Sequence, residues 1–223
     1  MNMKTRIFSV YILLLAGFFI SCGSGDNKDQ TPASFCDSDC TGELIADSAN
    51  IPEKSFVRIT MVACQADSIT WGNNKMDAYR QMKFDELAGK ELTLNEKVVK
   101  IHIFGTEYAW VQFNSCKTGQ GFIAKLPFNK TDNIYRKTGA FNPADPAYKV
   151  HESLVAYTDR GNIFVEEMAT GKKAMMTFGA ETDLEYTAMH ETVESVEITP
   201  TRVKARVRIG KEWKDLEKEI TLE

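Results

Sequence analysis

Most of the chain beyond residue 55 alternates apolar and polar side chains with a period of two. In the segment 56–64, Val57, Ile59 and Met61 alternate with polar or charged residues, and the segment 98–104 repeats the pattern. Successive side chains of a β-strand point to opposite faces, so this alternation predicts strands with one buried face. The same pattern predicts further strands at Tyr108–Phe113, Gly121–Leu126, Ser153–Thr158, Asn162–Met168, Lys173–Phe178, Val193–Thr199, Arg202–Ile209 and Glu212–Leu222.

The connections between these strands are short and rich in turn residues. The segments 159–161 and 169–172, which read Asp-Arg-Gly and Ala-Thr-Gly-Lys, have the composition of hairpin turns, and the link 114–119 is also turn-rich. Consecutive strands with tight connections favour antiparallel meanders. The sequence therefore predicts a mainly β fold of antiparallel meanders, built as a barrel, a sandwich or propeller-like blades.

One stretch, Asn74–Ala88, has a helical rather than a two-residue period. Its apolar residues approximate one face of a helix: Met76, Tyr79, Phe84 and Leu87. Gly89 follows directly, and glycine is the usual residue just beyond a helix C-terminus. We therefore expect one short helix within the β fold.

The first 22 residues have the composition of an export signal. Two basic residues precede the apolar run Ile7–Ile20, which is shorter than the roughly 18 to 20 residues that span a bilayer. The run ends in Phe-Ile-Ser-Cys at positions 19–22, which resembles the lipobox of bacterial lipoproteins. This resemblance implies a signal peptide over residues 1–21 and an acylated Cys22 that attaches the protein to a lipid bilayer.

Beyond Cys22 the chain divides into a tether and two β regions. Residues 22–34 lack apolar periodicity and are predicted to be a flexible tether. Residues 35–136 form a disulfide-bearing β region that contains the helix, and residues 147–223 form a β-meander region. Between them, Lys137–Pro146 is rich in Gly, Pro and Asn, which predicts a linker.

Four cysteines remain besides Cys22, namely Cys36, Cys40, Cys64 and Cys116. An even number of cysteines in an exported protein predicts two disulfides. Their spacing lacks the paired short intervals of zinc sites, so we predict no metal there. A bond between Cys36 and Cys40 would close a very tight loop, so we expect each of them to pair with Cys64 or Cys116.

The charge of the chain argues against nucleic-acid binding. It has 27 Lys and Arg against 31 Asp and Glu, a formal net charge of −4, whereas nucleic-acid binding requires a surplus of cations. One face of the predicted strand 202–209 nevertheless carries four cations: Arg202, Lys204, Arg206 and Arg208. This face is a candidate anion-binding surface, unless acids on neighbouring strands, such as Glu197, Asp215 and Glu217, neutralise it.

No motif predicts catalysis or a cofactor. His151 and His190 each precede a glutamate, as in zinc proteases, but neither has a second histidine four residues later. A calcium-loop-like opening at Asp37 has Ser48 where a bidentate glutamate is needed. The remaining catalytic alternative is a small envelope hydrolase, such as a glycosidase with a pair of carboxylates, which the sequence does not single out.

Two tripeptides, Asp-Ser-Ala at 47–49 and Asp-Ser-Ile at 67–69, are similar to the short acceptor of O-glycosylation in Bacteroidota. This similarity implies candidate glycan sites at Ser48 and Ser68. Three aromatic residues are candidates to stack on sugar rings if they are exposed, and belong to the core if they are not: Trp71, Tyr108 and Trp110.

The segments 159–165, 168–173 and 110–116 together resemble uncharacterised lipoproteins common in Bacteroidota. The resemblance implies a lineage and no mechanism. We therefore expect a lipid-anchored protein of the bacterial cell envelope, on the periplasmic side or the cell surface. Its expected role is non-catalytic, as a binding or assembly module for an acidic glycan or an envelope protein.

Overall fold

The computed structural model describes residues 43–48, 53–179 and 184–223. All of them fall within one compact unit. Outside the described residues lie the predicted signal peptide, the tether, Cys22, Cys36 and Cys40. No helix in the described part of the chain is long and apolar enough to cross a membrane.

The described chain is mainly β and forms four open sheets. The first contains β1 (Glu43–Asp47), β2 (Phe56–Val62), β3 (Gln65–Gly72) and β4 (Arg80–Lys83). The second contains β5 (Val99–Phe104), β6 (Tyr108–Asn114), β7 (Gly121–Pro127) and β8 (Tyr135–Thr138). The third contains β10 (Leu154–Asp159), β11 (Asn162–Glu167) and β12 (Lys173–Thr177). The fourth contains β15 (Glu212–Glu219), β14 (Arg202–Ile209), β13 (Val193–Thr199) and β9 (Tyr148–Val150), in that order.

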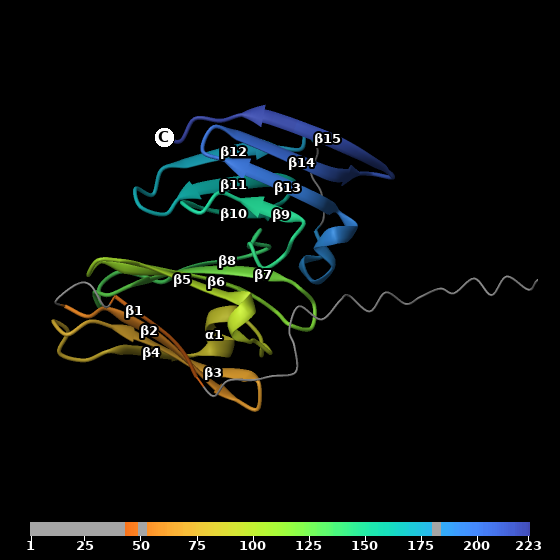
Figure 1. Ribbon diagram of the computed structural model, residues 1–223. Helices are drawn as coiled ribbons and strands as arrows, with labels where there is room; N and C mark the ends of the chain where they lie inside the picture. The colour runs from red at the N-terminus through yellow and green to blue at the C-terminus, as the bar shows by residue number, and fades with distance from the viewer. Residues whose placement is uncertain (1–42, 49–52, 180–183) are drawn as a thin grey trace, which may run out of the picture. The chain divides into compact units, whose positions relative to one another are not determined.

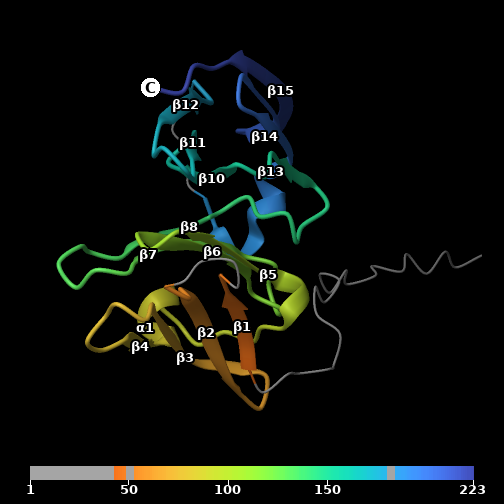
Figure 2. The ribbon, with the colours of Figure 1, turned by 60° about the vertical axis from the view of Figure 1, so that its left-hand side comes forward.

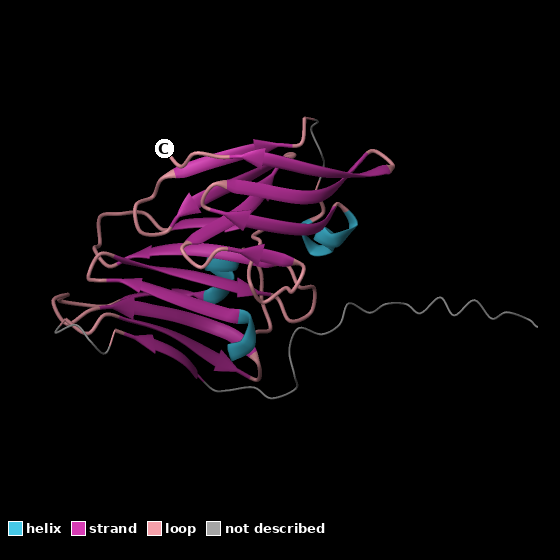
Figure 3. Ribbon diagram, turned by 45° about the horizontal axis from the view of Figure 1, so that its top comes forward, coloured by secondary structure: helices cyan, strands magenta, loops and turns pink. Residues whose placement is uncertain are grey.

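Neighbouring strands in the first three sheets are consecutive in the chain and antiparallel, which confirms the predicted meanders. The exception is β9, which pairs with β13 in parallel. Strands dominate the fold and helical segments are few (Figure 3). The alternation that predicted these strands matches their burial, since Val57, Ile59 and Met61 are all buried in β2.

The four sheets are layered in the order one, two, three and four, with an apolar core between each neighbouring pair (Figures 1 and 2). The first core packs sheet one against sheet two and includes Trp71 and Phe113. A smaller core with Trp110 and Val155 packs sheet two against sheet three. The third core, which includes Val207, packs sheet three against sheet four. Sheet two is therefore covered on both faces, and every residue of β6 after Tyr108 is buried.

The segment 137–146, which we predicted to be a linker, is instead packed between sheets two and three. Ala140 is fully buried and forms a β-bridge with Tyr157 of β10. Its amide also donates to the carbonyl of Gly121 in β7 at 3.0 Å. The glycine and proline content therefore reflects a tight crossing from one sheet to the next, not a flexible connection.

Asn142 holds this crossing in place. Its side chain is buried, and Nδ2 donates to the Phe113 and Phe122 carbonyls at 3.0 and 2.9 Å. The same amide nitrogen also donates to Oδ1 of Asn114 at 3.0 Å. These acceptors lie on β6 and β7, so a turn-forming residue serves as a buried hydrogen-bond donor to sheet two.

The helix predicted over 74–88 is mostly wrong. Only α1 (Phe84–Ala88) is α-helical, and it ends at Gly89, whose φ of 78° is the left-handed conformation expected there. The residues before it form β4, in which Met82 pairs with Ile69 of β3. Pairing with β3 satisfies more backbone groups than one isolated helical turn does. Two short 3₁₀ segments complete the fold, η1 (Glu96–Val98) and η2 (Tyr186–Glu191).

Cys64 and Cys116 are both disulfide-bonded. Both cysteines lie beside the same two residues, Thr93 and Leu94. The Cys64 carbonyl accepts from the Leu94 amide at 3.2 Å, and the Cys116 amide donates to the Thr93 carbonyl at 2.9 Å. Their pairing with Cys36 and Cys40 stays a prediction, since those two residues lie outside the described part of the chain.

Candidate functional site

The four cations of β14 lie on its outer face and meet acids on both neighbouring strands. Arg202 lies 3.6 Å from Glu197 and 3.4 Å from Glu217, which also pairs with Lys204 at 3.3 Å. Arg206 pairs with Asp215 at 3.4 Å and with Glu194. Arg208 has Trp213 as its cross-strand partner.

The acids predicted as partners, Glu197, Asp215 and Glu217, therefore do neutralise this face. A face on which carboxylates match most of the cations has little net potential to attract an anion. Exposed ion pairs of this kind also contribute little stability, about 0–1 kcal/mol each. We place no anion site on β14.

Two of the three aromatic residues singled out in the sequence belong to the core. Trp71 is 1% exposed and Trp110 is fully buried, and their indole N–H groups donate to the carbonyls of Pro127 and Met168 at 2.9 and 3.3 Å. Tyr108 is partly exposed, and its hydroxyl donates to the Met168 carbonyl at 2.8 Å. Only Tyr108 of the three therefore presents a ring near the surface.

Tyr108 belongs to a group of aromatic and charged residues where sheets two and three face each other. On sheet two, Lys125 of β7 lies between Trp110 of β6 and Tyr135 of β8. On sheet three, Tyr157 pairs with Phe164, whose rings stack at 5.1 Å. We call the following residues the aromatic-lysine cluster: Tyr108, Trp110, Lys125, Tyr135, Lys137, Tyr157, Phe164, Glu166 and Lys173.

The lysines of the cluster lie over aromatic rings. The Lys125 ammonium is 3.8 Å from the ring centroid of Tyr108, and the Lys137 ammonium is 5.1 Å from that of Tyr157. A ring face attracts a cation but carries no formal charge to cancel it. Within residues 43–48, 53–179 and 184–223, neither lysine pairs with a carboxylate. Lys173 does, at 3.3 Å from the buried Glu166.

Burial holds the Tyr135 hydroxyl in its neutral form. Desolvation, and then a hydrogen bond with Tyr157, raise the pKa of Tyr135 far above its usual range. Desolvation likewise raises the pKa of Tyr108. Both phenols therefore remain protonated at any physiological pH, so the cluster keeps its net positive charge.

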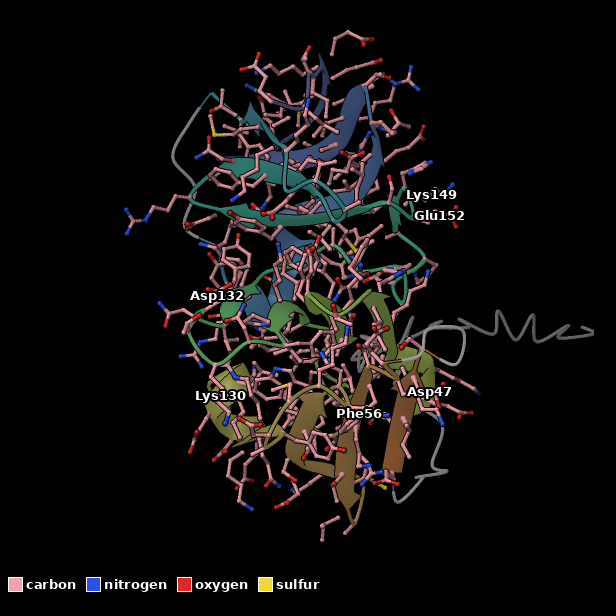
Figure 4. The ribbon with its side chains drawn as sticks, turned by 90° about the vertical axis from the view of Figure 1, so that its left-hand side faces the viewer. Asp47, Phe56, Lys130, Asp132, Lys149 and Glu152 are labelled. Carbon is pink, nitrogen blue, oxygen red and sulfur yellow. The ribbon has the colours of Figure 1, made fainter. Side chains whose placement is uncertain are left out.

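The loop between β7 and β8 is fastened next to the cluster. It carries Lys130 and Asp132 (Figure 4), and Arg80 of β4 donates to the carbonyls of Asn129 and Asp132 at 2.6 and 3.0 Å. The Arg80 guanidinium also lies 5.2 Å above the Trp71 ring. These contacts fix the hairpin whose strands present Lys125 and Tyr135.

A cleft of about 420 Å³ adjoins the cluster and shares Lys137 and Tyr157 with it. It lies where the end of α1, strands β7, β8 and β10, and η2 come together. Arg136 and Asp159 also line it, with an apolar floor that includes Phe122. The lining mixes apolar and polar groups, and Arg136 and Lys137, which are consecutive on β8, extend to opposite faces of sheet two.

The three histidines do not form a catalytic group. Nε2 of His190 lies 2.7 Å from Oδ2 of the buried Asp145, and its ring stacks on Tyr148. The hydrogen bond with Asp145 raises the pKa of His190, whereas burial lowers the pKa of His102. Among the described residues, the His151 ring hydrogen-bonds only with its neighbour Ser153. Among the described residues, no group of three or more metal-ligating side chains could hold a metal ion.

The two candidate glycan acceptors differ in exposure. Ser68 lies in β3 and is 6% exposed, so its hydroxyl is not available for modification in the folded chain. Ser48 is partly exposed and follows Asp47 at the end of β1 (Figure 4). Its hydroxyl donates to the Ser55 carbonyl at 3.1 Å. Only Ser48 remains a predicted acceptor.

The chain matches no protein family model and no curated protein. A solved structure, "KlHsv2 with loop 6CD replaced by a Gly-Ser linker", is similar at 10% sequence identity over 74% of this chain and 71% of that chain, with a TM-score of 0.20. A score this low supports no statement about fold or function. The interpretation of the site therefore depends on its own geometry.

Proposed function

We propose that the chain is a non-catalytic binding module of the bacterial cell envelope whose ligand is an acidic glycan. The binding surface is the aromatic-lysine cluster. The observation that carries the proposal is the pair Lys125 and Lys137, which lie on aromatic rings and have no carboxylate partner in the described part of the chain.

The chemistry of the cluster suits a charged sugar. The rings of Tyr108, Tyr135 and Tyr157 are partly exposed, and each has a lysine ammonium over one face, so a sugar would contact the lysines and the exposed ring edges together. The lysine ammonium groups supply donors and positive charge for carboxylate or sulfate groups. Hydrogen bonds to charged groups are about twice as strong as neutral ones, so these two lysines would dominate the affinity.

A binding role is favoured over the hydrolase alternative by the composition of the cleft. Hydrolysis of a glycosidic bond generally requires two carboxylates on opposite sides of the bond. Among the described residues that line the cleft, Asp159 is the carboxylate. Glu166 lies in the cluster but is buried and paired with Lys173.

The proposal is tested by affinity chromatography on an immobilised polyuronate, with a neutral glucan as the reference matrix. The double variant Lys125→Gln, Lys137→Gln should elute from the polyuronate at clearly lower salt, reflecting a loss of about tenfold or more in affinity. The matched control Lys172→Gln, Lys214→Gln removes the same charge from two exposed lysines outside the cluster. Equal shifts in both variants would mean that net charge alone governs retention and would reject the proposal.

The envelope location is a separate part of the proposal and depends on Cys22. Acylation of this residue would anchor the binding surface at a membrane, because several acyl chains on one residue give stable attachment. Wild type should enter the detergent-rich phase in phase-separation experiments, and Cys22→Ala should not. If both remain in the aqueous phase, the lipid anchor is ruled out.

A further inference from the structure

The two lysines that carry the proposed function lie on the same face of sheet two. Lys125 of β7 is directly opposite Tyr135 of β8. Lys137 of β8 is directly opposite Ile123, which precedes Lys125 by two residues on β7. Directly opposite residues share a face of a sheet, and so do residues two apart on one strand. Both ammonium groups are therefore accessible to one ligand that lies along this face.

The two ammonium groups point away from each other. Residues in this diagonal relation on neighbouring strands are roughly 7–8 Å apart. From there Lys125 extends toward β6, where its ammonium lies 3.8 Å from the ring centroid of Tyr108 and 5.6 Å from that of Trp110. Lys137 extends toward sheet three, where its ammonium lies 5.1 Å from the ring centroid of Tyr157. The two charges are therefore too far apart to share one carboxylate through hydrogen bonds of roughly 2.7–2.9 Å.

Aromatic rings occupy the gap between the two lysines. The rings of Trp110 and Tyr135 meet there edge to face, with their centroids 5.9 Å apart. The Lys173 ammonium also approaches Tyr135, at 5.6 Å from its ring centroid, but it is paired with Glu166. Among the described residues, a further anionic group in this gap would meet no cation that lacks a carboxylate partner. The gap therefore suits a neutral sugar.

A groove of about 610 Å³ continues the surface beyond Lys125. Tyr108 and Lys125 line it, together with Pro127, which is directly opposite Tyr108 and so lies on the same face of sheet two. The turn between β5 and β6 contributes Glu107, and the loop between β7 and β8 contributes Asp132 (Figure 4). A glycan bound at Lys125 would therefore meet two carboxylates next.

Both carboxylates of the groove are exposed, and neither pairs with a cation in the described part of the chain. Desolvation, and then the charge of nearby Glu107, raise the pKa of Tyr108. Asp132 accepts a hydrogen bond from the Asn129 side-chain amide at 2.9 Å, which leaves further lone pairs on its carboxylate. Carboxylates accept hydrogen bonds from sugar hydroxyl groups and repel other carboxylates. The groove therefore favours a neutral sugar and disfavours an acidic one.

We infer that the ligand of the aromatic-lysine cluster is a glycan in which anionic residues alternate with neutral residues. The anionic residues bind Lys125 and Lys137. One neutral residue lies over the ring edge of Tyr135 between them, and another lies in the groove, where Glu107 and Asp132 accept its hydroxyl groups. This inference rests on the proposed function and deepens it, because a polymer of uronate alone is then a weaker ligand of the same two lysines.

The test compares two hexasaccharides by isothermal titration calorimetry with the full chain. One is a hyaluronan hexasaccharide, in which glucuronate alternates with N-acetylglucosamine. The other is hexagalacturonate, which has twice as many carboxylates. The hyaluronan hexasaccharide should bind more tightly, by about threefold or more, because hexagalacturonate places carboxylates in the gap and in the groove. Hexagalacturonate that binds as tightly or more tightly would show that charge alone sets the affinity and would overturn the inference.

The double variant Glu107→Gln, Asp132→Asn tests whether the groove causes this preference. It removes both negative charges and keeps hydrogen-bond acceptors, so hexagalacturonate should bind about threefold more tightly than it binds wild type, while hyaluronan binding changes less. The matched control Glu212→Gln, Glu219→Gln removes two exposed carboxylates of β15, outside the groove and the cluster. An equal gain in the control, or no gain in the double variant, would reject the inference.

The polyuronate column separates this inference from the proposed function. If retention does not depend on Lys125 and Lys137, the proposed function is wrong and the inference is wrong with it. If retention depends on both lysines but hexagalacturonate binds at least as tightly as the hyaluronan hexasaccharide, the cluster is supported and the alternation is rejected.

Discussion

The outer face of β14 and the aromatic-lysine cluster carry similar numbers of cations, and they differ in what lies opposite those cations. On β14, Arg202, Lys204 and Arg206 meet carboxylates on β13 and β15. In the cluster, Lys125 and Lys137 meet aromatic rings. A regular row of cations on one strand is therefore a weaker indication of an anion site than the identity of the cross-strand neighbours.

The sheets that carry these two surfaces also differ in burial. Sheet two is covered on both faces by sheets one and three, whereas the outer face of sheet four is exposed. Substitutions in sheet two should therefore destabilise the protein more than comparable substitutions in sheet four. The first two predictions test this difference.

The largest expected effect is that of Gly121→Ala in sheet two. A Cβ at this position would be 2.1 Å from the Ala140 carbonyl oxygen, so the crossing segment would have to move. We expect the unfolding free energy in urea to fall by about 3 kcal/mol or more, as for other overpacked sites. In the control Gly210→Ala, in the β14–β15 turn, the Cβ meets nothing within 4 Å. The φ of 65° at Gly210 should cost only about 1–2 kcal/mol. Equal losses would contradict the packing described for the 137–146 segment.

Asn142→Ala should have the next largest effect. It removes a buried donor that contacts three acceptors of β6 and β7. The Phe113 and Phe122 carbonyls keep each other's amides as partners in the β6–β7 ladder, whereas Oδ1 of Asn114 loses its donor among the described residues. An unsatisfied buried polar group costs about 1–3 kcal/mol and a lost hydrogen bond about 0.5–1.5 kcal/mol, so we expect a loss of roughly 2–4 kcal/mol in urea unfolding. Asn162→Ala, which removes one hydrogen bond at a partly exposed turn, is the control and should cost about 1 kcal/mol or less. A loss at Asn142 no larger than this would mean that water replaces its contacts.

The fold could be predicted from the sequence where local alternation and burial agree. β2, β5 and β14 were predicted within one or two residues because each has one apolar face against a core. The helix predicted over 74–88 is mostly absent because the apolar residues of this stretch contact different parts of the fold. Tyr79 packs edge-on against Phe56, and Phe84 packs in the first core. Helical spacing in a sequence does not show which distant residues each side chain contacts.

The candidate site could not be predicted because it is assembled from distant segments. Tyr108 and Lys173 are 65 positions apart in the chain, and six strands contribute to the cluster. The sequence gives one modest indication of the cluster. Tyr135 and Lys137 alternate with exposed residues on β8, so their side chains lie on the same face of the sheet. The acids opposite β14 were predictable because β13, β14 and β15 are consecutive, so their side chains meet through short turns.

Single lysine and arginine variants test whether the two cationic surfaces differ in anion binding. Lys125→Gln should reduce affinity for a polyuronate by roughly threefold to tenfold, which corresponds to about 0.7–1.4 kcal/mol. Arg206→Gln removes the same charge from a face where Glu194 and Asp215 already balance it, and should leave the affinity unchanged. It should also change the unfolding free energy by less than about 1 kcal/mol. Weaker polyuronate binding by Arg206→Gln than by Lys125→Gln would assign the anion site to β14 after all.

The smallest expected effect is a pH dependence in the half of the chain that contains sheet four. His190, at the end of η2, is half exposed and bonds to the buried Asp145, which raises its pKa above the ordinary 6.5. The charged groups near it are Asp145 and, through a backbone contact, Glu194, while Tyr148 stacks on its ring.

A histidine whose pKa is raised on folding contributes stability that is fully present below its unfolded pKa. This contribution is lost as the pH rises through the folded pKa. The unfolding free energy of wild type should therefore exceed that of His190→Gln at pH 5.5 by more than it does at pH 8.5, with the change occurring above pH 6.5. Solvent screening of the exposed ring limits the difference to about 1 kcal/mol or less. His151→Gln, which removes an exposed histidine whose ring bonds to Ser153 and not to Asp145, is the control. A pH-independent difference for His190→Gln would mean that the contact with Asp145 is equally strong when the histidine is neutral, and that ring stacking on Tyr148 holds η2 in place instead.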